Sequence, residues 1–196
     1  FFTNGIKYFE ALRLALLTNF SEFGVFEYIF PFVWLTAGFI IVVFIKKVVG
    51  STSWQGPADA IYCAHRPDKT MDIRQGFGTV LASFTSLSAG ASSGQYGPIV
   101  HMGALIGSFF RKYNISSIVL SNDIFLGCGV AAAISAGFQA PIAGVIFAHE
   151  AILRHFSVRA IAPIAISSIC AASVGEWLNL NDNILVLNFH SEPLMK

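Results

Sequence analysis

Charge is scarce in this chain. Lys, Arg, Asp and Glu make up 12% of its 196 residues, whereas soluble domains hold about a quarter. Apolar residues make up 55% of the chain, and its mean hydropathy is +0.66. This composition excludes an ordinary water-soluble domain and predicts a polytopic membrane protein. The net charge of +1 gives no reason to expect a nucleic-acid partner.

Cysteine is also rare, and its placement excludes two kinds of site. Cys63, Cys128 and Cys170 are the three cysteines, and none belongs to a CxxC pair. We therefore expect buried free thiols, with neither a disulfide framework nor a metal site. The first residues, FFTNG, include neither an initiating Met nor the basic segment of a signal peptide, so we expect a portion of a longer chain.

The sequence also gives little support for a membrane enzyme. HEAILRH at 149–155 has Leu153 where the second His of a zinc-protease HExxH would stand. No paired aspartates lie within an apolar segment. We predict that the chain is not an enzyme, and we assign it no catalytic residue, metal ligand or cofactor.

Long apolar segments bounded by basic residues are present instead. Residues 29–49 form an apolar run of the length that crosses a bilayer, closed by Lys46 and Lys47, and 160–178 form a second. By the positive-inside tendency, the basic clusters mark cytoplasmic ends; they lie at 46–47, 66–74, 111–112 and 154–159. The remaining segments are predicted as the end of a membrane or interfacial helix (1–18), a polar connection (19–28), helices rich in small residues (76–89 and 116–135) and a polar tail (179–196).

Three helices are predicted to begin inside hydrophobic regions. Gly56-Pro57, Gly97-Pro98 and Ala140-Pro141 open the helices 57–65, 98–113 and 141–153, with Pro98 expected at the first helical position. The first N–H groups of a helix have no intrahelical partner, so at membrane depth they need a ligand. An anion suits them, because the N-terminal end of a helix dipole is positive. Interrupted helices of this kind mark ion sites in transporter folds.

Smaller features of these helices also carry expectations. Asp59, just inside the short helix 57–65, is predicted to stabilise the N-terminus of that helix. Asp123 is expected to do the same near the start of the helix that follows. Gly103 and Gly107 stand four residues apart, a spacing that favours close helix packing.

Two long motifs carry a resemblance to a known family. GQYGPIVHMGALIG at 94–107 resembles the motif GREGPxVxxGxxxG of the CLC chloride channels and chloride/proton antiporters. GVAAAISAGFQAPIAGVIFAHE at 129–150 resembles that family's segment GxAAGxAAAFxAPxxGxxFxxEE, and SWQGP at 53–57 occupies the place of its GSGIP. The motifs stand in the family's order, and the resemblance extends over about 29–178.

The resemblance implies an all-α membrane protein with tilted and broken, re-entrant helices. Residues 1–196 would then form a single, partial transmembrane domain, the first of the two inverted halves of a CLC subunit. Its partners would be chloride or another small anion, the lipid bilayer, the missing second half of the subunit and a second copy in a homodimer. The expected location is a multi-pass position in the plasma or inner membrane, with voltage-gated chloride channel activity.

The departures from the family motifs bear on mechanism. Tyr96 stands at the family's gating glutamate, and Trp54 stands at the serine that offers a hydroxyl to the anion. The second glutamate of the family's EE pair, a proton relay, falls on Ala151. A phenol titrates near a pKa of about 10 and Ala does not titrate, so neither residue exchanges protons near neutral pH. The substitutions predict passive anion transport that is not coupled to protons.

The predicted anion pathway combines the family match with the helix starts. Its residues are Gly94, Gln95, Tyr96, Gly97, Ile99, Val100, Trp54, Gly56 and Phe138, with the N–H groups of Gly97, Ile99 and Val100 as donors. The alternatives are loop and helix-start roles for the glycines and packing roles for the rings of Tyr96 and Phe138. His101 and Glu150 are possible proton relays; alternatively, His101 packs in the core and Glu150 forms a salt bridge or cap at the cytoplasmic end.

Two other functions remain open at this point. A proton route through His101, Glu150 or the missing half would make the protein a chloride/proton antiporter. A non-transporting regulatory membrane subunit is the other, because Trp54 and Tyr96 are bulky where the family has smaller or mobile groups.

Overall fold

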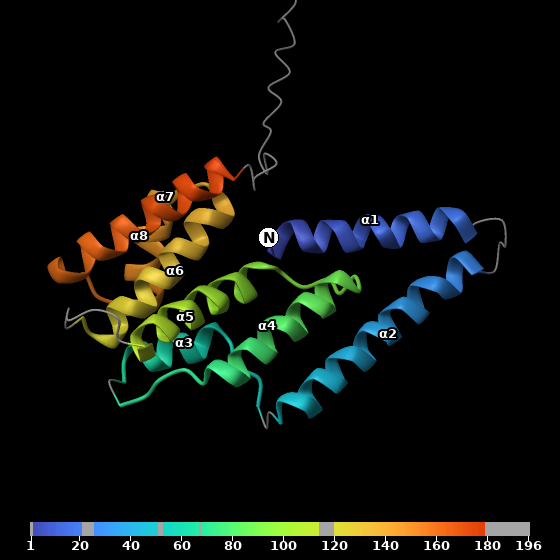
Figure 1. The fold of residues 1–196 in the computed structure, drawn as a ribbon, viewed down its shortest axis with the longest axis horizontal. Coiled ribbons are helices and arrows are strands. Elements are labelled where there is room, and N and C mark those ends of the chain that lie inside the picture. The colour runs from blue at the N-terminus through green and yellow to red at the C-terminus, as the bar shows by residue number, and fades with distance from the viewer. Residues whose placement is uncertain (1, 21–25, 51–52, 67, 114–119, 179–196) are drawn as a thin grey trace, which may run out of the picture.

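The computed structural model of the chain describes residues 2–20, 26–50, 53–66, 68–113 and 120–178 (Figure 1). Within these ranges the secondary structure is entirely helical, which confirms the predicted all-α class. The helices are α1 (Phe2–Phe20), α2 (Phe26–Val49), α3 (Pro57–Ala64), α4 (Ile73–Ser88), α5 (Tyr96–Tyr113), α6 (Asn122–Phe138), α7 (Pro141–Phe147), the π-helical turn η1 (Ala148–Leu153) and α8 (Val158–Trp177).

Two of the helices are long and apolar enough to cross a membrane. They contain Ile29–Val49 of α2 and Val158–Trp177 of α8, which agree with the predicted spans 29–49 and 160–178. Most of α2 is not covered by other helices: Phe32, Phe39 and Phe44 are each at least 65% exposed. Apolar side chains in such numbers are costly in water and favourable against lipid acyl chains.

Helix α5 starts two residues earlier than predicted. The helix begins at Tyr96, so Pro98 is the third helical residue and not the first. The first backbone hydrogen bond of the helix runs from the Ile99 N–H to the Gln95 carbonyl, at 3.2 Å. A proline at the third position breaks no bond, because the N–H groups before Ile99 have no intrahelical acceptor in any case.

The helix predicted over 141–153 has the expected bounds, as α7 followed by η1, and Arg154 just beyond it is in the left-handed region, with φ of 57°. Other helix boundaries differ from the prediction. The connection predicted at 19–28 is shorter, because α1 continues to Phe20 and α2 starts at Phe26. α6 extends three residues beyond 135 to Phe138, while 116–119 of that predicted helix and the tail predicted at 179–196 lie outside the described residues.

Helices α5 and α6 are held together by backbone contact. A Cβ on Gly103 would collide with the Gly129 carbonyl, and a Cβ on Gly107 would collide with the Phe125 carbonyl. The predicted packing role of Gly103 and Gly107 is confirmed. A side-chain hydroxyl also joins α6 to α8: Ser135 Oγ donates a hydrogen bond to the Ser168 carbonyl at 2.6 Å. Polar bonds between small residues of this kind stabilise helix association in membranes.

Substitution at this contact gives a direct test of the packing. We expect Gly103→Ala to lower the free energy of unfolding by about 1–3 kcal/mol, because the added methyl group must push two helix backbones apart. Gly94→Ala is the matched control, since a Cβ there meets nothing within 4 Å. Denaturant titration of both variants in detergent measures the difference. Equal stability of the two would contradict the close contact.

Candidate anion site at the start of α5

The site is formed where the starts of two helices and the end of a third come together. A Cβ on Gly97, in the first turn of α5, would lie 3.8 Å from Cγ of Pro57 at the start of α3. On the other side, a Cβ on Gly137 near the end of α6 would lie 3.9 Å from Cγ2 of Ile99. Segments 53–57, 94–101 and 137–141, which the sequence motifs singled out separately, are therefore neighbours in space.

Two of the predicted pathway residues are in direct contact. The rings of Tyr96 and Phe138 stack with their centroids 4.9 Å apart and their planes at 26°. Both side chains remain partly accessible, at 54% and 40% exposure. The packing interpretation of these residues and the pathway interpretation are thus compatible, because the stacked pair lies beside the start of α5 and keeps a solvent-facing edge.

The free backbone donors at the start of α5 match the expected set only at Gly97. The Ile99 N–H is already bonded to the Gln95 carbonyl, and Val100 is buried further along the helix. The N–H groups of Tyr96 and Gly97 have no acceptor in the described part of the chain. The donor set Gly97, Ile99 and Val100 is therefore wrong for the last two residues, and the available pair is Tyr96 and Gly97. Gly94, exposed, and Gln95, half-buried, precede them in the loop.

The start of α3 is capped by a side chain of the same helix. The Gly56 N–H donates to Oδ2 of Asp59 at 2.7 Å, which confirms the predicted role of Asp59. The preceding Gln55 N–H donates to Oγ1 of Thr79 at 3.2 Å. Gly56 was predicted as an anion-binding residue, but its N–H is occupied by a carboxylate that would also repel an anion.

Trp54 lies close to the loop 89–95 between α4 and α5. Its ring has Lys46 Nζ at 5.9 Å from the centroid, and the residue is 38% exposed. Together with Ser93 and Pro98 it lines a cavity of about 260 Å³. Trp54 is therefore adjacent to the start of α5, but it offers a ring face and an indole N–H where the family's serine would offer a hydroxyl.

The two possible proton relays lie in different surroundings. His101 is 1% exposed, and neither ring nitrogen has a hydrogen-bond partner among the described residues. Glu150 is exposed on η1, and among the described residues it forms no ion pair or hydrogen bond. The predicted salt bridge or cap is therefore not seen in the described part of the chain, where His155 Nε2 instead lies 3.9 Å from Asp123 Oδ2. Asp123 is in the first turn of α6, as predicted.

Sequence reasoning missed Arg13. This residue of α1 lines a cavity of about 430 Å³ together with Gly94 and Gln95 of the loop 89–95 between α4 and α5, and with Tyr96, the first residue of α5. The signal was the spacing of Lys7, Glu10 and Arg13, three charges in steps of three residues along one helix. Such spacing places Glu10 and Arg13 on one face.

A second motif was also overlooked. Residues 90–94 read GASSG, which has the letters of the GxSxG nucleophile motif. That motif works on a sharp turn between a strand and a helix. Here the segment joins α4 to α5, and the described residues contain no strand. The letters therefore do not correspond to a nucleophile elbow.

These features define a class: an all-helical domain of membrane character in which the starts of α3 and α5 lie close together. A family model described as "Voltage gated chloride channel" matches residues 35–195. The chain therefore belongs to the voltage-gated chloride channel family, and the resemblance to the CLC proteins is confirmed.

Relatives with curated names agree with this family. A Ralstonia nicotianae protein named "Putative chloride channel protein ClcB-like" is 29% identical over 107 residues, which are 53% of this chain and 25% of the relative. An Escherichia coli protein named "Voltage-gated ClC-type chloride channel ClcB" is 28% identical over 105 residues, 54% of this chain and 25% of the relative. The match thus covers a quarter of the length of either relative.

The ring contact between Tyr96 and Phe138 can be tested by its contribution to stability. In a double-mutant cycle with Tyr96→Ala and Phe138→Ala, we expect a coupling of about 0.5–1.5 kcal/mol in the free energy of unfolding, the usual value of a stacked aromatic pair. Phe77→Ala is the control partner, because Phe77 is exposed on α4 and has no ring contact with Tyr96. Denaturant titration measures all variants. A coupling no larger than that of the control cycle would refute the stack.

Proposed function

We propose that this chain contributes one part of a transmembrane pathway for chloride or similar small anions, and that transport is passive and not coupled to protons. The chain would be a single, partial transmembrane domain with several re-entrant helices, completed by further protein and paired in a homodimer. Its location would be a multi-pass position in a plasma or inner membrane. The proposal extends to this chain what the names of its relatives state.

The observation that carries the proposal is the pair of unused N–H groups at Tyr96 and Gly97. They stand at the start of α5, an 18-residue helix whose dipole places positive potential at that end. No acidic residue occupies the first turn of α5, and its last turn holds Arg111 and Lys112. Backbone donors attract an anion less strongly than a Lys or Arg charge does, which favours release as well as binding.

The absence of proton coupling is inferred from the residue types along the pathway. Tyr96 and Ala151 replace the two glutamates of the family motif, and neither holds a proton that leaves near neutral pH. His101 lies buried within the helix packing, and exposed Glu150 lies on η1. These two residues are the basis of the competing antiporter function.

One observation favours a non-transporting subunit. The rings of Tyr96 and Phe138 stack beside the free N–H groups of α5, and Trp54 lines a cavity with Ser93 and Pro98 next to the same helix start. A pathway closed at both places would make the chain a structural or regulatory membrane component.

Simultaneous measurement of chloride and proton movement separates the three functions. With the intact protein in liposomes under a chloride gradient, we expect chloride efflux without stoichiometric proton uptake, because positions 96 and 151 carry no carboxylate. A chloride electrode and a pH electrode record both fluxes in one sample. Stoichiometric proton uptake would establish the antiporter instead, and folded protein without flux would establish the non-transporting subunit.

Restoring a carboxylate at position 96 tests the place of the pathway. We expect Tyr96→Glu to make chloride flux pH-dependent, high in acid and low at neutral pH, because the ionised side chain competes with the anion for the same N–H groups. A glutamate titrates near a pKa of about 4.3 when unperturbed, so flux should fall as pH rises through its pKa.

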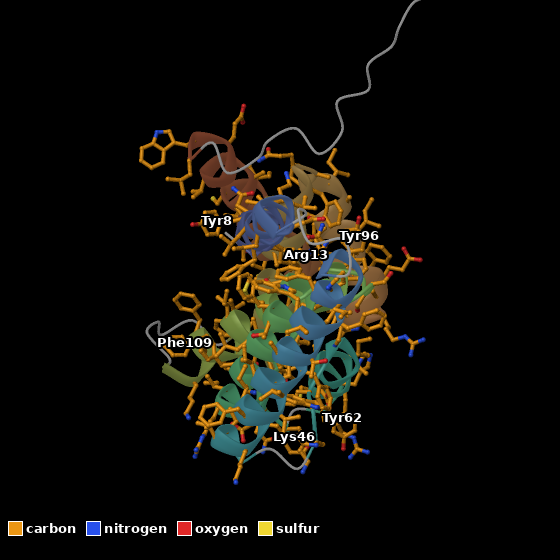
Figure 2. The ribbon with its side chains drawn as sticks, turned by 90° about the vertical axis from the view of Figure 1, so that its right-hand side faces the viewer. Tyr8, Arg13, Lys46, Tyr62, Tyr96 and Phe109 are labelled. Carbon is orange, nitrogen blue, oxygen red and sulfur yellow. The ribbon has the colours of Figure 1, made fainter. Side chains whose placement is uncertain are left out.

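The matched controls share either the position or the substitution. Tyr96→Gln has the size of glutamate without its charge and should give flux independent of pH. Tyr62→Glu introduces the same carboxylate on α3, and Figure 2 shows Tyr62 and Tyr96 toward opposite ends of the molecule. Identical pH profiles for Tyr96→Glu and Tyr62→Glu would place the pathway elsewhere.

A further inference from the structure

A basic cavity lies between the start of α4 and the end of α5, and it shares no lining residue with the candidate anion site. Its volume is about 760 Å³, and its walls come from residues 70–74, which lead into α4, and from the last turns of α5. Figure 1 shows these two helices side by side and running in opposite directions. They pack closely, because a Cβ on Gly76 would collide with the side chain of Leu105. The cavity is therefore part of the contact between α4 and α5.

The walls of this cavity carry more positive than negative charge. Arg74, Arg111 and Lys112 are cations, and Asp72 is the one carboxylate among the described lining residues. Oδ1 of Asp72 accepts hydrogen bonds from the N–H groups of Arg74 and Gln75, at 2.9 and 3.4 Å, so this carboxylate caps α4. None of the three cations forms an ion pair in the described part of the chain. Cations grouped in this way attract a negatively charged ligand to the cavity.

Two buried polar groups in the α5 wall lack partners. Ser108 is 5% exposed, and its hydroxyl forms no hydrogen bond among the described residues. Nη1 of the half-buried Arg111 is also covered without an acceptor there. Both residues line the cavity, and their spacing of three places them on one face of α5. Since buried polar groups are hydrogen-bonded as a rule, a ligand with acceptor oxygens fits this wall.

An apolar strip of α5 leads to the basic groups. Ile106, Phe109 and Phe110 are 48%, 42% and 53% exposed, and Phe109 also lines the cavity. Their spacing of three and four residues places them on one side of the helix, in the turn before Arg111. A free phosphate ion gains nothing from such a surface. A phospholipid does, because its acyl chains lie next to its phosphate and are buried favourably against apolar side chains.

Three basic segments meet at this end of the domain. Nη2 of Arg74 donates a hydrogen bond to the Val48 carbonyl, at 3.4 Å, in the last turn of α2, which also holds two lysines. The last turn of α5 holds the other two cations of the cavity. Basic residues at the ends of membrane helices are typical of the cytoplasmic surface, where anionic lipids are found. The cavity is therefore expected at the level of the lipid headgroups.

We propose that this cavity binds the phosphate headgroup of an anionic phospholipid. The Arg111 guanidinium and the Ser108 hydroxyl donate hydrogen bonds to phosphate oxygens, while the neighbouring cations supply positive charge. The acyl chains lie along the exposed apolar strip of α5. The cavity volume of about 760 Å³ is within the range of small-molecule sites, roughly 300–1,000 Å³. This lipid site is independent of the proposed anion pathway.

Binding of short-chain lipids to the intact, purified protein in nonionic detergent tests this site. Calorimetric titration with dioctanoyl phosphatidylglycerol should give saturable binding. Dioctanoyl phosphatidylcholine, whose headgroup is neutral overall, should bind at least about tenfold more weakly, because it lacks the net charge that the cavity attracts. Inorganic phosphate is the third probe and separates the headgroup from the whole lipid.

Two variants and a matched control locate the binding. Arg111→Gln should raise the Kd for phosphatidylglycerol about tenfold, as expected for loss of a charge-assisted hydrogen bond. Ser108→Ala should raise it about fivefold without changing the charge, which separates a specific site from general attraction to a basic surface. Arg159→Gln is the control, since it removes an exposed charge at the start of α8, outside the cavity, and its Kd should stay within about twofold of the parent value.

The outcomes are decisive in both directions. An unchanged Kd in Arg111→Gln or Ser108→Ala, or an equal loss in Arg159→Gln, overturns the site. Equal affinity for the two lipids, or inorganic phosphate bound as tightly as phosphatidylglycerol, overturns the assignment to an anionic lipid. Should Arg111→Gln fail to fold, Asp72→Asn takes its place. Asparagine keeps the helix cap and removes a negative charge, so the Kd should fall, and an unchanged Kd overturns the site.

Discussion

The direct backbone contact between α5 and α6 is the constraint on which the rest of this structure depends. Gly103, Gly107 and Gly129 allow the two helices to approach until carbonyl groups of one lie against the other. This fixes where α5 starts relative to where α6 ends, and so it brings Tyr96 against Phe138. In lipid there is little hydrophobic force between helices, so such close packing and the hydroxyl bonds around it must supply the cohesion.

The two helix starts of the site differ in whether their backbone N–H groups have hydrogen-bond acceptors. At α3, Asp59 folds back onto the Gly56 N–H and closes the helix start from within. At α5, the residues of the first turn carry no comparable side chain, and two N–H groups stay open. Two helix starts that each carry a proline in the first turn therefore differ: the start of α3 is capped, and the start of α5 keeps two N–H groups without acceptors among the described residues.

The fold could be predicted from the sequence wherever a pattern is local. Prolines after glycine or alanine located three helix starts to within two residues, and the apolar runs located both long spans. The prediction failed where the result depends on neighbours in space. The expected donors at Ile99 and Val100 were wrong because the helix begins two residues early, and Gly56 is occupied because Asp59 reaches back to it. Arg13 lies beside the loop 89–95 through tertiary packing, about 80 residues away in sequence; the charge spacing on α1 indicates a shared helix face but not which segment that face contacts.

In the proposed anion pathway, the Tyr96–Phe138 stack would determine how fast the space beside the start of α5 opens. Because α5 and α6 are locked by glycine contacts, the space beside the start of α5 is opened most easily by rotating a ring about its own side-chain bonds. Rotamer changes of exposed side chains take on the order of picoseconds to nanoseconds, whereas collective helix movements take microseconds to milliseconds. In the proposed anion pathway, such a barrier would open and close far faster than an electrical recording resolves, so the two rings would set the size of the average current and would give no separate closed state.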